Sequence, residues 1–168
     1  QVKPGWPFTR GKGAAIGIAV GDVDNDGNRE IVFGTVDHTY LLTPAGALYN
    51  QTWSDIAVPG PTIALGDLDE DGDLEIVIGP EYATPVVYAY HHNGLPVAGW
   101  PVSTYCPFPV RMVVGAIADI AGDGDVEVSG SDVRRVWLWH HNGVPVTGAG
   151  PIVQAPVQNG LICVTALS

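Results

Sequence analysis

Short apolar runs separated by polar turns recur along this chain. Residues 31–34 (Ile-Val-Phe-Gly) and 76–79 (Ile-Val-Ile-Gly) are rich in β-branched side chains, which favour strands over helices. Further along, Asn93-Gly94 and Asn142-Gly143 are flanked by apolar residues. This is the strongest short signal for a tight hairpin turn, because both central positions need positive φ. The pattern predicts many short antiparallel strands.

A polar loop of one design precedes each of the two β-branched runs. Residues 22–30 read Asp-Val-Asp-Asn-Asp-Gly-Asn-Arg-Glu, and forty-five residues later residues 67–75 read Asp-Leu-Asp-Glu-Asp-Gly-Asp-Leu-Glu. A third copy, residues 119–127 (Asp-Ile-Ala-Gly-Asp-Gly-Asp-Val-Glu), begins fifty-two residues after the second. Repeats of about this length with four strands each are typical of β-propeller blades.

We therefore expect one all-β, propeller-type domain with three four-stranded antiparallel blades and a split blade strand at each terminus. Gly5-Trp6-Pro7 repeats as Gly99-Trp100-Pro101, so the first segment resembles the outer strand of a blade. The last segment resembles the first strand of a fourth repeat. The expected boundaries are a strand at 1–10, blades at about 11–55, 56–104 and 105–154, and a strand at about 155–168. Within the second blade, strands are expected at about 61–67, 74–80, 85–92 and 95–103.

The loops have the chemistry of a calcium site. Ca²⁺ takes several oxygen ligands, and alternating aspartates around a glycine turn can direct their carboxylates to one point. An EF-hand is excluded, because its twelfth position requires Glu and here holds Phe33 and Ile78. Two copies in phase predict two structural Ca²⁺ sites. The third loop has Ala121 at its third position, so a weaker or empty site is expected there.

These loops and the strands behind them resemble the FG-GAP or VCBS type repeats of integrin-like β-propellers, over nearly the whole chain. The resemblance implies that side chains at loop positions one, three, five and nine, with the backbone carbonyl of position seven, bind calcium. It also implies a role in extracellular or cell-surface adhesion, in glycan binding, or as a scaffold beside a catalytic domain. The implied ligands are Asp22, Asp24, Asp26, Glu30 and the Asn28 carbonyl; Asp67, Asp69, Asp71, Glu75 and the Asp73 carbonyl; and Asp119, Asp123, Glu127 and the Asp125 carbonyl.

The charge of the chain is concentrated in these loops. The formal net charge is −11, and 14 of the 18 acidic residues lie in the three loop windows. With seven Lys and Arg in all, the chain lacks the basic surface that nucleic acid requires. No apolar stretch approaches the roughly 20 residues of a membrane span, and we expect no cleavable signal segment within these residues. We expect a secreted or cell-surface location.

Five pairs of residues leave alternatives open. The spacing of Cys106 and Cys163 does not decide whether they form a disulfide; two small buried thiols are the favoured alternative. The histidine pairs at 91–92 and 140–141 are expected to be exposed beside their turns. In a transition-metal alternative only one of each pair could contribute, since strand neighbours face opposite sides. Trp137 with Trp139, and Tyr88 with Tyr90, are expected to pack between blades, with sugar stacking as the alternative.

Catalytic motifs are absent from the sequence. It contains no GxSxG, HExxH or phosphate-binding glycine loop, and the calcium sites account for most of its acids, so no enzyme activity is expected. The expected function is a calcium-binding structural or adhesive module that self-associates through open blade edges into a closed oligomer or an extracellular fibre. A glycan or a cell-surface protein is a possible further partner. The alternatives are a calcium-dependent lectin-like module and the non-catalytic part of a polysaccharide-degrading enzyme.

Overall fold

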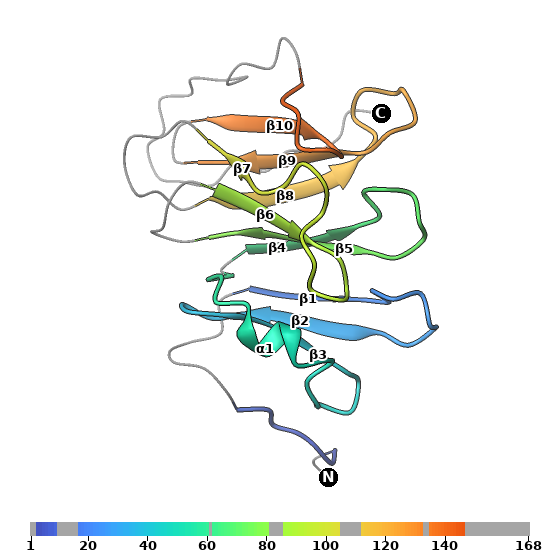
Figure 1. The fold of residues 1–168 in the computed structure, drawn as a ribbon, viewed down its shortest axis with the longest axis vertical. Coiled ribbons are helices and arrows are strands. Elements are labelled where there is room, and N and C mark those ends of the chain that lie inside the picture. Colours follow the sequence, from blue (N-terminus) through green and yellow to red (C-terminus); the bar gives the residue numbers. More distant parts are fainter. Residues whose placement is uncertain are drawn as a thin grey trace.

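The computed structural model describes residues 3–9, 17–60, 62–80, 86–104, 112–132 and 135–146. Three antiparallel sheets follow one another through these residues, stacked along the long axis of the molecule (Figure 1). The all-β class is therefore confirmed. The described residues do not close into a ring. The expected C-terminal strand, Cys106 and Cys163 lie outside the described residues.

Each sheet corresponds to one sequence repeat. The first has the order β1-β2-β3, the second β4-β5-β6-β7 and the third β10-β9-β8. The bounds are β1 (Gly17–Gly21), β2 (Glu30–Gly34), β3 (Thr39–Leu42), β4 (Thr62–Gly66), β5 (Glu75–Gly79), β6 (Val86–Tyr90), β7 (Val102–Ser103), β8 (Val113–Ala118), β9 (Glu127–Ser131) and β10 (Val136–His140).

The expectation of four strands per blade is correct for the second sheet, whereas the first sheet has three strands in the described part of the chain; the end of the third repeat, residues 147–154, lies outside the described residues. The first three strands of the second sheet match the expected positions closely, but β7 is much shorter than the expected 95–103. In the first repeat a short helix, α1 (Thr52–Asp55), follows β3 and its turn. This helical turn directs the indole of Trp53 into the core, where its Nε1 donates to the His92 carbonyl at 2.7 Å. No helix in the described ranges has the length and apolar composition of a membrane span.

The strand registers set the acidic loops at one edge of the stack. Gly21 pairs with Glu30 and Gly66 with Glu75, so each loop closes immediately after its hairpin's last residue pair. Ala118 pairs with Glu127 in the same way, although β8 has an irregular register between Val114 and Ile117. All three loops therefore extend from the same side of the molecule (Figure 1).

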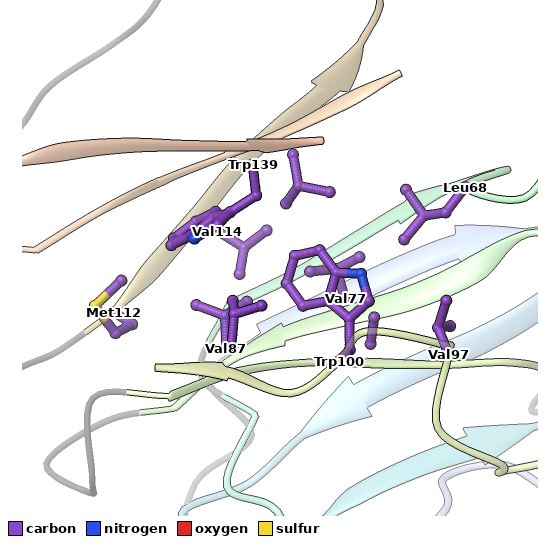
Figure 2. Close-up of a cluster of buried hydrophobic side chains, with 11 residues drawn as sticks. Leu68, Val77, Val87, Val97, Trp100, Met112, Val114 and Trp139 are labelled. Atoms are coloured by element: carbon purple, nitrogen blue, oxygen red, sulfur yellow. The ribbon is translucent and has the colours of Figure 1, made fainter. Parts of the chain in front are cut away.

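Two apolar clusters hold the sheets together. One contains Val77 and Val87 of the second sheet and Val128 and Trp139 of the third, and Figure 2 shows its side chains meeting between the two sheets. The other lies between the first and second sheets, around Trp53. Of the paired aromatics, Trp139 contacts Trp100 edge-on at 6.2 Å and Tyr90 contacts Trp53 at 5.9 Å, both between neighbouring sheets. Trp137 and Tyr88 are partly buried against the same two clusters.

Glycines allow the first strands of neighbouring sheets to approach closely. A Cβ atom added to Gly21 would lie 2.8 Å from Cδ1 of Leu65, and one added to Gly66 would lie 2.6 Å from Cγ2 of Ile117. Both distances are shorter than real carbon contacts, so a larger residue would require the facing aliphatic side chain or its sheet to shift. Each of these contacts sets a large aliphatic side chain of one sheet over a glycine of the sheet before it.

Tryptophan indoles form a second repeated contact between neighbouring segments. Each indole donates its N–H to the backbone carbonyl of the second residue of a turn in the following repeat. The three pairs are Trp6 with Pro44 at 3.5 Å, Trp53 with His92 at 2.7 Å, and Trp100 with His141 at 2.8 Å. Residues 3–9 therefore lie against the first sheet's turn as residues around Trp100 lie against the third sheet's turn.

Candidate metal centres

The three acidic loops share one backbone conformation. Their fourth positions have positive φ (Asn25 56°, Glu70 61°, Gly122 75°), and so do the glycines at position six (90°, 94° and 101°). The first aspartate of each loop accepts a hydrogen bond from the backbone N–H of that glycine through its Oδ2 atom, at 3.0 to 3.1 Å. These bonds fold each loop tightly enough to bring its carboxylates together.

In the first loop the structure brings three of the expected ligands together. Carboxylate oxygens of Asp22, Asp24 and Asp26 all lie within 4.8 Å of one another. Asp24 also accepts a hydrogen bond from the Tyr49 hydroxyl at 2.6 Å. This carboxylate contributes to raising the pKa of Tyr49, after burial of the phenol, which is the largest cause. Glu30 lies outside this group.

In the second loop the expected ligands form two overlapping groups. Oxygens of Asp67, Asp69 and Glu75 lie within 4.8 Å of one another, and so do ligand atoms of Asp69, Asp71 and His91. One atom, Oδ1 of Asp67, is buried without a hydrogen-bond partner. A buried carboxylate oxygen with no donor is costly unless a cation satisfies it, so these residues fit a divalent ion.

The ninth-position glutamates are buried and bind the backbone of their own loops. Glu30, Glu75 and Glu127 are each 2% exposed or less. Their Oε2 atoms accept the N–H of the second loop position: Val23 at 3.1 Å, Leu68 at 2.6 Å and Ile120 at 2.9 Å. Burial raises the pKa of Glu30 and of Glu75, and these hydrogen bonds oppose the rise. A nearby cation would favour the ionised form of both groups.

The third loop brings no comparable group together among the described residues. Both oxygens of Asp119 accept backbone N–H groups, from Gly122 at 2.6 Å and Gly124 at 3.1 Å among others. Oε2 of Glu127 accepts two more, from Ile120 and Ala121. Asp123 is not grouped with these acids. The expectation of a weaker or empty site at this loop stays a prediction. The role of the Asn28, Asp73 and Asp125 carbonyls stays a prediction.

The histidine pairs differ from the sequence expectation. His91 Nδ1 lies 3.0 Å from Oε1 of Glu75, and His92 Nδ1 lies 2.7 Å from Oδ2 of Asp73. In the third sheet, His140 and His141 approach Glu127 and Asp125 at 3.2 and 3.7 Å. Both members of each pair face the acidic loop, so the expectation that they face opposite sides was wrong. The second histidine lies in the turn, where strand alternation no longer applies. The recurring His-His after the third strand was the available signal.

Replacing Glu75 by Gln is expected to stabilise the metal-free protein at neutral pH. The raised pKa of Glu75 means that its ionised form costs folding free energy. The stabilising contribution of protonated Glu75 is therefore full below the pKa that this group has in the unfolded chain. It is lost as the pH rises through the higher pKa of Glu75 in the folded protein. Gln keeps an oxygen for the Leu68 N–H and removes the charge that faces Asp69 and His91. Melting in chelator at acidic and neutral pH should show a flatter pH dependence in Glu75→Gln than in the exposed control Glu70→Gln. Equal pH dependence in both variants would contradict this.

Replacing Ala121 by Asp is expected to complete the third loop. Ala121 occupies the position of Asp24 and Asp69, and the backbone around it has the same left-handed turns. Ligand charge count sets the affinity of such sites, so the added carboxylate should tighten this loop by about 10-fold or more. Isothermal titration calorimetry should then report one additional bound ion per chain. An unchanged number of bound ions per chain would contradict the assignment of the third loop as an incomplete calcium site.

Together, the fold and the loops define a repeat protein of stacked antiparallel sheets with acidic hairpin loops along one edge. No protein-family model matches the chain, and a comparison with curated proteins finds no match. Among solved structures, the biofilm matrix protein Bap1 of V. cholerae is similar to it, with a TM-score of 0.54 and 20% identity. The similarity covers 78% of this chain and 20% of that one, so this chain spans about a fifth of its length. At this identity the similarity concerns the fold alone.

Proposed function

We propose that this chain is a non-enzymatic structural or adhesive module of a secreted or cell-surface protein, stabilised by Ca²⁺ at its first and second acidic loops. The observation that carries the proposal is Asp67 Oδ1, which is buried without a hydrogen-bond partner among the convergent acids of the second loop. The first loop repeats the same positions and gathers three aspartates. Carboxylate oxygens are the ligands that Ca²⁺ prefers.

The metal role in this proposal is structural rather than catalytic. The loops connect the first two strands of each sheet, so a bound ion would fix the hairpin and neutralise acids that repel one another. Oxygen-rich cages of this kind leave little open coordination for activating a water molecule. We accordingly propose no enzyme activity.

An extracellular adhesive role draws support from two sources. The solved protein with a similar fold is described as a biofilm matrix protein. Among the described residues, the outer face of the first sheet also exposes large aliphatic side chains, which fits self-association through a further sheet. A lectin-like role is not proposed, because the aromatic side chains offered as a sugar platform pack against the two cores.

The decisive experiment compares two substitutions in the same loop. Asp67→Asn removes a proposed ligand. Glu70→Gln removes the charge of an exposed residue that is not among the acids brought together in this loop. Calorimetric titration should show calcium affinity at the second loop falling by about 100-fold in Asp67→Asn and changing little in Glu70→Gln. Equal affinity in both variants, or no calcium binding by the unaltered chain, would refute the proposed function.

A further inference from the structure

Among the described residues, the outermost face of the first sheet is apolar, and its first strand is not covered by another sheet. Ile18 and Val20 of β1 are 71% and 57% exposed, although both are large aliphatic residues. Together with Ile31 and Phe33 they surround a hollow of about 500 Å³. These four residues are called the leading face below. The equivalent residues of the second sheet, Ile63 and Leu65, pack against the core between the first two sheets.

Contacts between neighbouring sheets follow one rule in this chain. In each sheet, one aliphatic residue lies two positions before the first aspartate of the acidic loop. It packs over the residue of the preceding sheet that comes directly before the first aspartate of that sheet's own loop. Leu65 packs over Gly21, and Ile117 packs over Gly66. The corresponding residue of the first sheet is Val20, and the corresponding uncovered small residue of the third sheet is Ala118.

The sizes of the two uncovered residues complement each other. Val20 is one carbon shorter than Leu65 or Ile117, and Ala118 is one carbon larger than Gly21 or Gly66. A contact of Val20 with Ala118 would therefore have about the same combined side-chain volume as Leu65 with Gly21 or Ile117 with Gly66. Packed interfaces tolerate exchanges that conserve this volume. We infer that the leading face binds the exposed face of the third sheet of a second copy of this chain, head to tail.

The exposed face of the third sheet suits this contact. Gly115, Ala116 and Ala118 of β8 are all exposed and small, with a shallow hollow of about 80 Å³ beside them. Ser129 also lines the hollow, and its hydroxyl is already satisfied by the backbone N–H and carbonyl of Ala116 at 2.8 and 2.9 Å. Burying this face would leave no unpaired hydroxyl at that position.

Residues 3–9 supply an independent match. In the second sheet, β7 follows Trp100 and pairs with β6 as the outer strand. Trp6 makes the equivalent indole contact with the first sheet, and Phe8 beside it packs on Phe33 at 5.6 Å. Residues 3–9 thus lie where the outer strand of a sheet covering the leading face would lie. The third sheet has three strands among the described residues, ending at β10, so residues 7–9 of one copy can extend it by strand addition.

The head-to-tail contact rests on the self-association in the proposed function, and it assigns that self-association to the leading face and the third sheet. Because two different faces meet, repetition of the contact produces a ring or a filament according to whether the rotation closes. Sedimentation velocity of the chain with Ca²⁺ should show a mass that rises with concentration. A monomer at every concentration would overturn the inference. Calcium binding, measured by calorimetry on the same sample, would still test the metal sites separately.

A charge on the leading face provides the first variant. Val20→Asp should weaken association by about 100-fold or more, because it buries an unpaired carboxylate in an apolar contact. Val36→Asp is the matched control, since Val36 is similarly exposed (52%) but lies in the turn between β2 and β3. The thermal shift on adding Ca²⁺ should be the same in both variants, which verifies folding. Equal association in both variants would overturn the assignment of the surface.

A size exchange tests the partner residue directly. Val20→Leu alone should overfill the contact and Ala118→Gly alone should leave a cavity, each weakening association by about 10-fold. The double variant recreates the internal pairing of Leu65 with Gly21 and should return to nearly the original affinity. Losses that simply add in the double variant would show that the two residues do not meet, and would overturn the head-to-tail arrangement.

Discussion

Removing Ca²⁺ from this protein is expected to lower its melting temperature by roughly 10 to 20 °C. Each site held at about 100 times its dissociation constant adds about 2.7 kcal/mol to the free energy of unfolding, so two sites add about 5 kcal/mol. For a chain of this length, 1 kcal/mol corresponds to roughly 2 to 4 °C. The physical source is the repulsion among Asp22, Asp24 and Asp26, and among the acids around Asp67, which only a cation relieves.

The measurement is thermal unfolding by circular dichroism in chelator and after Ca²⁺ is restored. Mg²⁺ serves as the control ion, because it demands shorter, octahedral coordination and gives up its water reluctantly. It should therefore recover much less of the lost stability than Ca²⁺ does. A melting temperature that is the same with chelator and with Ca²⁺ would show that the acidic loops are ordinary hairpin turns.

Truncation of Trp139 should give the largest effect of any single core substitution considered. Trp139 is 2% exposed and lies between the second and third sheets, beside Trp100 and Val114 (Figure 2). Trp139→Ala should lower the free energy of unfolding by about 3 to 5 kcal/mol, since both apolar contacts and packing volume are lost.

Trp137 provides a control from the same strand. It stacks on Trp139 at 6.1 Å but is only partly buried, and its Nε1 donates to Asp132 at 3.2 Å. Trp137→Ala should therefore cost clearly less than Trp139→Ala in urea unfolding of the calcium-bound protein. Equal costs would indicate that the third sheet is not held to the second through the Trp139 cluster.

The acidic loops illustrate how far local sequence determines a site. Alternating aspartates, a glycine at position six and a glutamate at position nine fix the turn through hydrogen bonds within nine residues. The convergence of Asp22, Asp24 and Asp26 was therefore predictable. The approach of His91 to Glu75 was not, because these residues come from different strands and meet only through the register of β5 with β6.

The sequence by itself determined the all-β class, the repeat, the positions of most strands and the acidic loops, because these depend on side-chain alternation and turn chemistry over a few residues. Only the tertiary structure decided that α1 replaces an outer strand in the first repeat, that both histidines of a pair face the acids, and that Ile18 and Val20 remain uncovered. Each of these depends on how one sheet packs against the next, since burial is a property of residues distant in the chain.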